Sequence, residues 1–267
     1  DMPVEAFSGF DAVINFAAIV HRPEVKDQEL YDDVNYRMAC LLAQKAKQAG
    51  VGQFVQMSTI AVFGSASRIS ETTPERPQTY YGSSKLKADK ELMAMSDREF
   101  KAAIIRPPMA YGGGMAPGNM LRLIRLVNKH IPLPFGSARN SRDFINVKNL
   151  VEFIHLAVEK EVEGVFYPTD KVPYSTRNVV EEISRQLGVH TVNLPSPSIF
   201  LKLVEKVRPD LYQKLWGDVV IDRQLALSAI GYEPRYTLED GMVRNFTVQE
   251  EVPELHYENS YARWLHS

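Results

Sequence analysis

The stretch Asp11-Ala12-Val13-Ile14-Asn15-Phe16-Ala17-Ala18 is a nearly continuous apolar run near the start of the 267-residue chain. Such a run is typical of a strand buried on both faces of a parallel sheet, because a half-exposed strand alternates apolar and polar residues. Two further short runs, 53–58 (QFVQMS) and 101–106 (KAAIIR), also predict strands. The three runs together predict a parallel sheet in which residues 11–18 form a central strand.

Helix-like segments separate these strands along the chain. Residues 28–49 predict one helix that ends at Gly50, a residue suited to the C-terminal cap, and residues 81–95 predict another. Strands that alternate with helices in this way indicate an α/β fold with helices over a parallel sheet.

The pattern changes after Pro107-Pro108, where a predicted loop occupies residues 111–118. Further helices and strands follow without an internal repeat or a long linker. We expect residues 1–110 to form the main body, and residues 111–267 to form mostly a smaller C-terminal lobe, with segments that return to the body. The predicted helices in this part are 119–129, 149–160, 176–187 and 198–207, and the predicted strands are 143–147 and 165–168.

The composition is that of an ordinary globular protein, with 45% hydrophobic residues, 24% charged residues and a net charge of −2. Lysine and arginine are spread along the chain, which argues against a nucleic-acid partner because phosphate binding needs clustered positive charge. No apolar run approaches the ~20 residues that span a bilayer, so we expect no membrane insertion. The single cysteine, Cys40, and the lack of a leader favour a cytoplasmic location. No metal site is predicted.

Tyr81 and Lys85 lie four residues apart in a predicted helix and therefore share one face. A phenol is a poor base at neutral pH, but an ammonium group beside it favours the phenolate. The pair suits proton transfer to and from a hydroxyl group, although two surface residues would show the same spacing. Tyr167 and Lys171 repeat the spacing, but Pro168 indicates a strand and turn there, so we expect no working pair.

Two hydroxyl residues, Ser58 and Thr59, stand where the predicted strand 53–58 ends. The carboxyl ends of parallel strands face the crevice in which open α/β sheets bind ligands. A hydroxyl group at this position can hydrogen-bond the same substrate oxygen that Tyr81 deprotonates. The alternative is that both residues only end the strand in a turn.

An ordered set of short motifs resembles the extended short-chain dehydrogenase/reductases, the nucleotide-sugar epimerase/dehydratase group. The resemblance runs from about residue 11 to 242. It implies a doubly wound, Rossmann-type parallel sheet with a C-terminal substrate lobe, a homodimer through helices 28–49 and 81–95, and NAD, or else NADP, as cofactor. The motifs are Asn15-Phe16-Ala17-Ala18, Ser58-Thr59 with Val62-Phe63-Gly64, Tyr81 with Lys85, Arg106-Pro107-Pro108 with Tyr111-Gly112, and Arg142-Asp143-Phe144-Ile145.

The resemblance also implies roles for individual residues. Tyr81 would be the catalytic base and acid, Lys85 would tune it and hold the nicotinamide ribose, and Thr59 would bind the reacting sugar oxygen. The other residues implied at the cofactor are Asp1, Phe16, Ala17, Ala18, Ser58 and Pro107. Those implied at the UDP-sugar are Asn119 and Arg142 at the diphosphate and Leu133 and Phe135 along the uracil. The alternative for Arg142 is a surface ion pair with Asp143.

Two features depart from the family pattern. Met109 stands where many members have an asparagine that touches the sugar nucleotide. The family's opening strand, Gly-x-x-Gly-x-x-Gly turn and helix have no counterpart, and Asp1-Met2 resembles the dipeptide that contacts adenine. The resemblance therefore implies that the first βαβ unit is absent and that one side of strand 11–18 is an unpaired edge. We expect a protein that begins at Asp1 to bind dinucleotide weakly.

The stretch 121–149, together with Ser175-Thr176 and 194–197, is most similar to bacterial UDP-N-acetylhexosamine 4-epimerases and 4-keto-reductases. The implied activity is NAD-dependent epimerisation at C4 of a UDP-sugar, an N-acetylhexosamine, through a 4-keto intermediate. One alternative is an NAD(P)H-dependent reductase of a 4-keto-sugar nucleotide. Another is a non-catalytic NAD(P)-sensing protein on the same fold.

Overall fold

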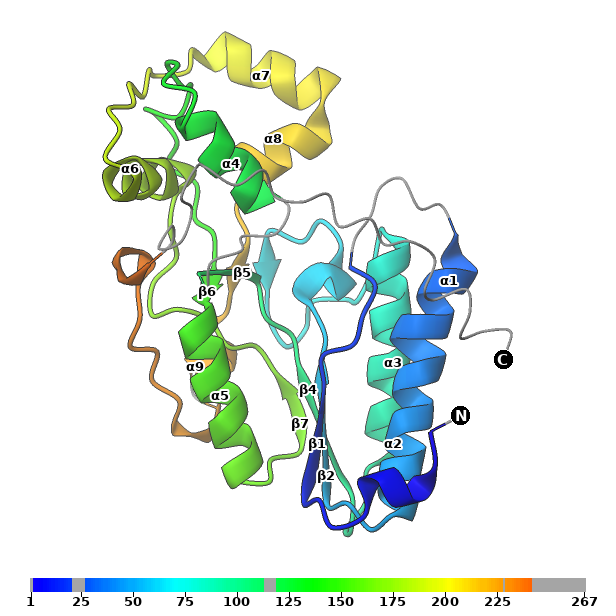
Figure 1. Ribbon diagram of the computed structural model, residues 1–267. Helices are drawn as coiled ribbons and strands as arrows, with labels where there is room; N and C mark the ends of the chain where they lie inside the picture. Colours follow the sequence, from blue (N-terminus) through cyan, green and yellow to red (C-terminus); the bar gives the residue numbers. More distant parts are fainter. Residues whose placement is uncertain (1, 21–26, 113–118, 228, 242–267) are drawn as a thin grey trace.

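Four parallel strands form the main sheet, in the order β1-β2-β4-β7 (Figure 1). The computed structural model describes residues 2–20, 27–112, 119–227 and 229–241. The strands are β1 (Ala12–Asn15), β2 (Gln53–Met57), β4 (Lys101–Ile105) and β7 (Gly164–Phe166). The predicted strands 53–58, 101–106 and 165–168 are therefore confirmed, and all pair in parallel.

Helices cover both faces of this sheet (Figure 1). On one face lie α2 (Met38–Gln48) and α3 (Tyr80–Met95), and on the other lies α5 (Val147–Glu159). Consecutive side chains of β2 point to opposite faces of the sheet. Phe54 packs in the cluster under α2 and α3, and Val55 packs in the cluster under α5. The two-sided burial explains why β2 and β4 lack an alternating pattern.

Strand β1 has one unpaired side in the described sheet, as the sequence analysis expected for residues 11–18. It is the outer strand of the described sheet, where it pairs with β2. Val13 packs on the side of α2, but Ile14 faces the opposite side and is exposed. The prediction that this run is buried on both faces is therefore wrong for Ile14, because the described residues cover only one face there.

The predicted helix 28–49 contains an irregular turn. It divides into α1 (Gln28–Asp32), a π-helical turn η2 (Asp33–Arg37) and α2. The side chain of Asp27 caps its start by accepting hydrogen bonds from the backbone N–H groups of Glu29 and Leu30. The wide turn places Asn35 inside the protein.

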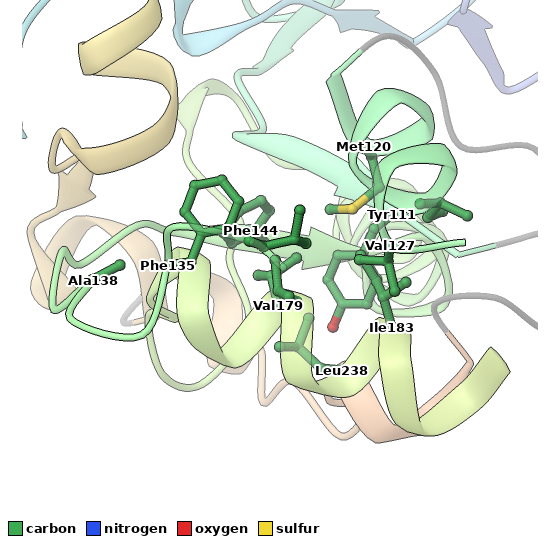
Figure 2. Packing of buried hydrophobic residues seen from close by; sticks show 12 residues of the cluster. Tyr111, Met120, Val127, Phe135, Ala138, Phe144, Val179, Ile183 and Leu238 are labelled. Carbon is green, nitrogen blue, oxygen red and sulfur yellow. The ribbon is translucent and has the colours of Figure 1, made fainter. Parts of the chain in front are cut away.

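The second lobe packs around α4 (Asn119–Val127) and α6 (Thr176–Leu187). Figure 2 shows its core, in which Phe135, Phe144 and Ile183 are among the buried residues. Two small parallel sheets accompany it, β5 (Met109–Tyr111) with β6 (Phe144–Asn146), and β3 (Arg68–Ile69) with β8 (Val220–Ile221). The remaining helices are α7 (Ser198–Val207), α8 (Pro209–Trp216) and α9 (Arg223–Leu227), and the 3-10 turns are η1 (Val4–Phe7), η3 (Ile60–Phe63), η4 (Ala229–Gly231) and η5 (Leu238–Asp240).

Within the described part of the chain, no helix has both the length and the apolar character needed to cross a membrane.

Candidate active site

The loops after β1, β2 and β4 leave the sheet at the same edge, because parallel strands share one carboxyl end. These loops carry Phe16, Thr59 and Pro107, three of the predicted site residues. The backbone N–H of Ile60 donates a hydrogen bond to the carbonyl oxygen of Pro107, 3.3 Å away, which ties the second loop to the third. The sheet therefore brings together residues that are far apart in sequence.

Tyr81 lies in the first turn of α3, which begins where the Thr79 hydroxyl accepts a hydrogen bond from the backbone N–H of Gly82. The side chain of Thr59 lies near the Tyr81 phenol and lowers its pKa. Gly82 permits this approach, since a Cβ atom there would lie 2.7 Å from the carbonyl oxygen of Ala61. The structure therefore places near each other the two hydroxyl groups that the sequence analysis predicted to act on one substrate oxygen.

Lys85 is buried one helical turn after Tyr81, and its Nζ atom donates a hydrogen bond to the carbonyl oxygen of Met57 at 2.8 Å. Burial lowers the pKa of Lys85 to about 8, an effect that the negative charge of Asp89 opposes. Burial also raises the pKa of Tyr81 to about 12, an effect that the nearby Thr59 side chain opposes. Tyr81 is therefore protonated at neutral pH, and it needs added positive charge nearby to act as a base.

A buried carboxylate that the sequence analysis missed lies behind this pair. Oδ2 of Asp89 accepts hydrogen bonds from the Ser58 hydroxyl at 2.7 Å and from Nε of Arg106 at 2.8 Å. Arg106 also contacts a carboxyl oxygen of Glu75 at 2.7 Å. Burial raises the pKa of Asp89, and the charge of Arg106 opposes that shift. The four-residue spacing from Lys85 was the available signal in the sequence.

Asn35 connects the loop after β1 to α3. Its side-chain oxygen accepts a hydrogen bond from the backbone N–H of Ile19 at 2.8 Å, and its amide nitrogen donates to the carbonyl oxygen of the same residue at 3.0 Å. The amide nitrogen also donates to the Ser84 hydroxyl at 3.1 Å. One buried amide thus holds the loop that carries Phe16 and Ala17 beside the helix that carries Tyr81.

The other predicted site residues in the loop after β1 are exposed or half-buried. Phe16 and Ala17 are exposed at the edge of the sheet, and Ala18 is half-buried. The backbone N–H of Ala17 donates to the side-chain oxygen of Asn15 at 3.0 Å. Asp1 lies outside the described residues.

Tyr167 does not form a second tyrosine-lysine pair. It follows β7 in a loop, and its hydroxyl accepts a hydrogen bond from Arg106 at 3.3 Å. Its ring packs against Phe63, with 6.0 Å between centroids, and Lys171 is exposed. The expectation that this pair is not on a helix is confirmed.

Arg142 faces a pocket of the second lobe. One guanidinium nitrogen donates to the carbonyl oxygens of Gln213 at 2.8 Å and Gly217 at 2.9 Å, at the end of α8. Asp143 pairs with Arg223, so the alternative of an Arg142–Asp143 ion pair is wrong. The pocket is lined by Met109, Met120, Leu123, Arg142, Phe144, Thr176, Val179, Lys214 and Leu215.

Leu133 and Phe135 are placed differently from what the resemblance implies. Both side chains are buried in the core of the lobe, and the Phe135 ring packs on Trp216 with 5.4 Å between centroids. Their side chains therefore do not line an open surface for a nucleobase, and the backbone N–H and carbonyl groups of Leu133 already pair with Val192 and Leu194. Asn119 begins α4, and its side chain lies outside the described residues.

The chain is similar to known 4-epimerases in sequence and in fold. It matches the NAD dependent epimerase/dehydratase family over residues 3–167. A UDP-glucose 4-epimerase of Vibrio cholerae is 34% identical over 242 residues, which cover 86% of this chain and 74% of the relative. An N-acetyl-alpha-D-glucosaminyl-diphospho-ditrans,octacis-undecaprenol 4-epimerase of Escherichia coli O157:H7 is 28% identical and covers 72% of this chain and 60% of the relative.

A solved structure agrees with the fold. The UDP-glucuronic acid 4-epimerase of Bacillus cereus, in complex with NAD, has a TM-score of 0.71 at 22% identity over 91% of this chain and 75% of its own. The Rossmann-type fold predicted from the sequence is confirmed, and so are the predicted family and the expectation of an enzyme. The chain belongs to the NAD dependent epimerase/dehydratase family.

Proposed function

We propose that the protein interconverts the C4 epimers of a UDP-sugar, an N-acetylhexosamine, with NAD as its cofactor. The observation that carries the proposal is the placement of Tyr81 near Thr59 at the carboxyl edge of the sheet, with the buried Lys85 one turn further along α3. The Vibrio cholerae relative, a UDP-glucose 4-epimerase, supports the same reaction.

The residues at the carboxyl edge fit a dinucleotide. The Lys85 ammonium carries three donors, of which the Met57 carbonyl accepts one, so it has capacity to bind a ribose hydroxyl. Phe16 and Ala17 are exposed in the loop after β1, at the same edge of the sheet, and Ser58 and Pro107 follow the strands β2 and β4. When bound, NAD would supply a hydride acceptor and donor for C4 and a positive charge that favours the Tyr81 phenolate.

Proton transfer is the part of the reaction that this chain's residues would perform. Thr59 would hold the 4-oxygen of the sugar while Tyr81 takes its proton. Lys85 would keep the phenolate accessible through its charge. After the 4-keto sugar turns over, Tyr81 would return the proton to the same oxygen, and Thr59 would again hold it.

The pocket of the second lobe suits the nucleotide diphosphate. Arg142 and Lys214 supply positive charge, and Met109 and Phe144 supply apolar surface. Asn119 lies at the start of α4, where a helix N-terminus favours an anion. The predicted homodimer through helices 28–49 and 81–95 stays a prediction.

A sugar on a polyprenyl diphosphate is a second candidate substrate. The name of the Escherichia coli relative states such a substrate. The observation that favours it is the exposed apolar surface of α7, on the hairpin whose other helix, α8, contributes Lys214 and Leu215 to the pocket. Both candidates share the diphosphate and the reaction at C4.

Product analysis tests the proposed function. The full-length protein incubated with UDP-N-acetylglucosamine and NAD+ is expected to form the 4-epimer without net formation of NADH, and NMR spectroscopy of the sugar distinguishes the two epimers. Parallel reactions with UDP-glucose and with polyprenyl-diphosphate N-acetylglucosamine identify the preferred substrate. Stoichiometric consumption of NAD(P)H on a 4-keto-sugar nucleotide, with no epimer formed in any reaction, would establish the reductase instead.

Replacing Arg142 with alanine is expected to weaken UDP binding about 10- to 100-fold, because a hydrogen bond to a charged group contributes roughly 1.5–3 kcal/mol. Isothermal titration with UDP measures the effect. Arg177→Ala is the matched control, since this arginine on the neighbouring α6 forms an exposed ion pair with Glu181. A change below twofold in Arg142→Ala would show that Arg142 only caps α8.

A further inference from the structure

The hairpin of α7 and α8 carries an apolar stripe that the rest of the described chain leaves uncovered. Neither helix has a buried residue. Ile199 is 81% exposed, Leu203 59% and Val207 63%. Their spacing of four residues places these three side chains on one face of α7. The hairpin lies at the outer end of the second lobe, away from the main sheet (Figure 1).

The hairpin holds its shape without this stripe. The ring of Trp216 stacks on Tyr212, with 6.1 Å between centroids, and meets Phe200 edge to face at 6.5 Å. The Arg142 guanidinium fixes the end of α8 through the carbonyl oxygens of Gln213 and Gly217. The exposed stripe is therefore not needed for the packing of the hairpin itself.

Positive charge borders the stripe. Lys202 and Lys206 each precede a stripe residue by one position, so they lie along one side of it. Glu205 follows Leu203 by two residues, which is a rotation of roughly 200° about the helix axis, so Glu205 lies on the side of α7 opposite the stripe. Residues 198–216 hold four basic residues against two acidic ones, whereas the whole chain has a net charge of −2.

The kinds of residue favour a lipid surface over a protein partner. Protein interfaces are enriched in aromatic residues and arginine and depleted in lysine. The stripe is aliphatic, and two lysines border it. Lysine stems cover apolar surface while their ammonium groups reach for phosphates, the arrangement of helices that lie in a membrane interface.

We propose that the α7–α8 hairpin docks on the surface of an anionic phospholipid bilayer. The stripe of Ile199, Leu203 and Val207 enters the boundary of the acyl chains, and Lys202 and Lys206 contact lipid phosphates. The second helix of the hairpin lines the pocket with Lys214 and Leu215, so docking holds this pocket at the bilayer surface. Docking is independent of the catalytic reaction, and it would present the site to a lipid-borne sugar diphosphate.

Vesicle flotation of the full chain tests the proposal. The protein is expected to float with vesicles of phosphatidylglycerol and phosphatidylcholine, but not with phosphatidylcholine alone. Leu203→Asp should lower the partition coefficient at least ~10-fold, because it places a charge in the apolar boundary. Lys202→Gln with Lys206→Gln should lower it about 25-fold, at roughly fivefold for each basic residue. Val151→Asp is the matched control, since Val151 on α5 is also 59% exposed.

Several results would overturn the proposal. One is the absence of vesicle binding by the unaltered protein, and another is equal binding by Leu203→Asp and Val151→Asp. If sedimentation shows that Leu203→Asp dissociates an oligomer, with vesicle binding unchanged, the stripe is a contact between copies. Circular dichroism confirms that each variant is folded. Turnover of a water-soluble UDP-sugar is measured on the same variants, so a failure of docking is distinguishable from a failure of the proposed reaction.

Discussion

Phenylalanine at position 81 of the full-length protein is expected to lower turnover of the UDP-sugar at least ~100-fold, the usual scale of lost acid–base catalysis. The substitution removes the hydroxyl that lies near Thr59 and leaves the ring in its place. Fold and dinucleotide affinity should persist, because Lys85 keeps its contact with Met57. Steady-state kinetics and a cofactor titration on the same preparation measure the two effects.

Tyr167→Phe is the matched control for this variant. Tyr167 is also partly buried, and its hydroxyl accepts a hydrogen bond from Arg106. It differs from Tyr81 in lying in a loop after β7, where its ring packs against Phe63. Near-normal turnover in Tyr81→Phe combined with an inactive Tyr167→Phe would show that Tyr167, and not Tyr81, transfers the proton.

Replacing Arg106 with methionine is expected to cost about 3–5 kcal/mol of unfolding free energy, because it leaves the Asp89 carboxylate buried without its charged partner. Urea unfolding measures the loss. Arg37→Ala is the control, since its ion pairs with Glu29 and Asp33 are exposed and should contribute less than ~1 kcal/mol.

The pH dependence and a double variant distinguish this mechanism from lost packing. Burial holds the pKa of Asp89 above its ordinary value, so the folded state binds this proton more tightly than the unfolded state. Stability from this group is therefore lost as the pH rises from the ordinary aspartate pKa through the folded one. The deficit of Arg106→Met should shrink in acid, and Asp89→Asn in the same chain should recover part of it. A deficit that is independent of pH and unrelieved by Asp89→Asn would indicate packing alone.

The sequence predicted the elements whose pattern extends over several turns. The helices 176–187 and 198–207 end where they were expected, because periodicity and the caps Ser175 and Gly188 act within the helix itself. The two-residue strands β3 and β8 are too short to show a period. The sequence analysis did not predict helix α8. Pro209 follows the end of α7 closely and so indicates only a helix end, although proline is also common in the first turn of a new helix.

The candidate site was predictable as far as its motifs are local. Tyr81 and Lys85 share one helix, and Thr59 ends one strand, so spacing and strand order sufficed. The pairing of Asp89 with Arg106 joins two elements through burial, which no local pattern reports. For Leu133 and Phe135 the resemblance implied a binding role, but their side chains pack in the core. A matching motif does not report whether a side chain is buried.

The π-helical turn at residues 33–37 predicts what a one-residue deletion in a related sequence would do to the structure. A π-helical turn holds one residue more than a regular turn needs. Deleting one residue there would restore the regular helix and rotate everything before it by roughly 100° relative to α2. Asn35 would then leave the backbone of Ile19, which it holds through two hydrogen bonds. A relative that is one residue shorter between Asp27 and Gly50 must therefore hold the loop after its first strand by other means.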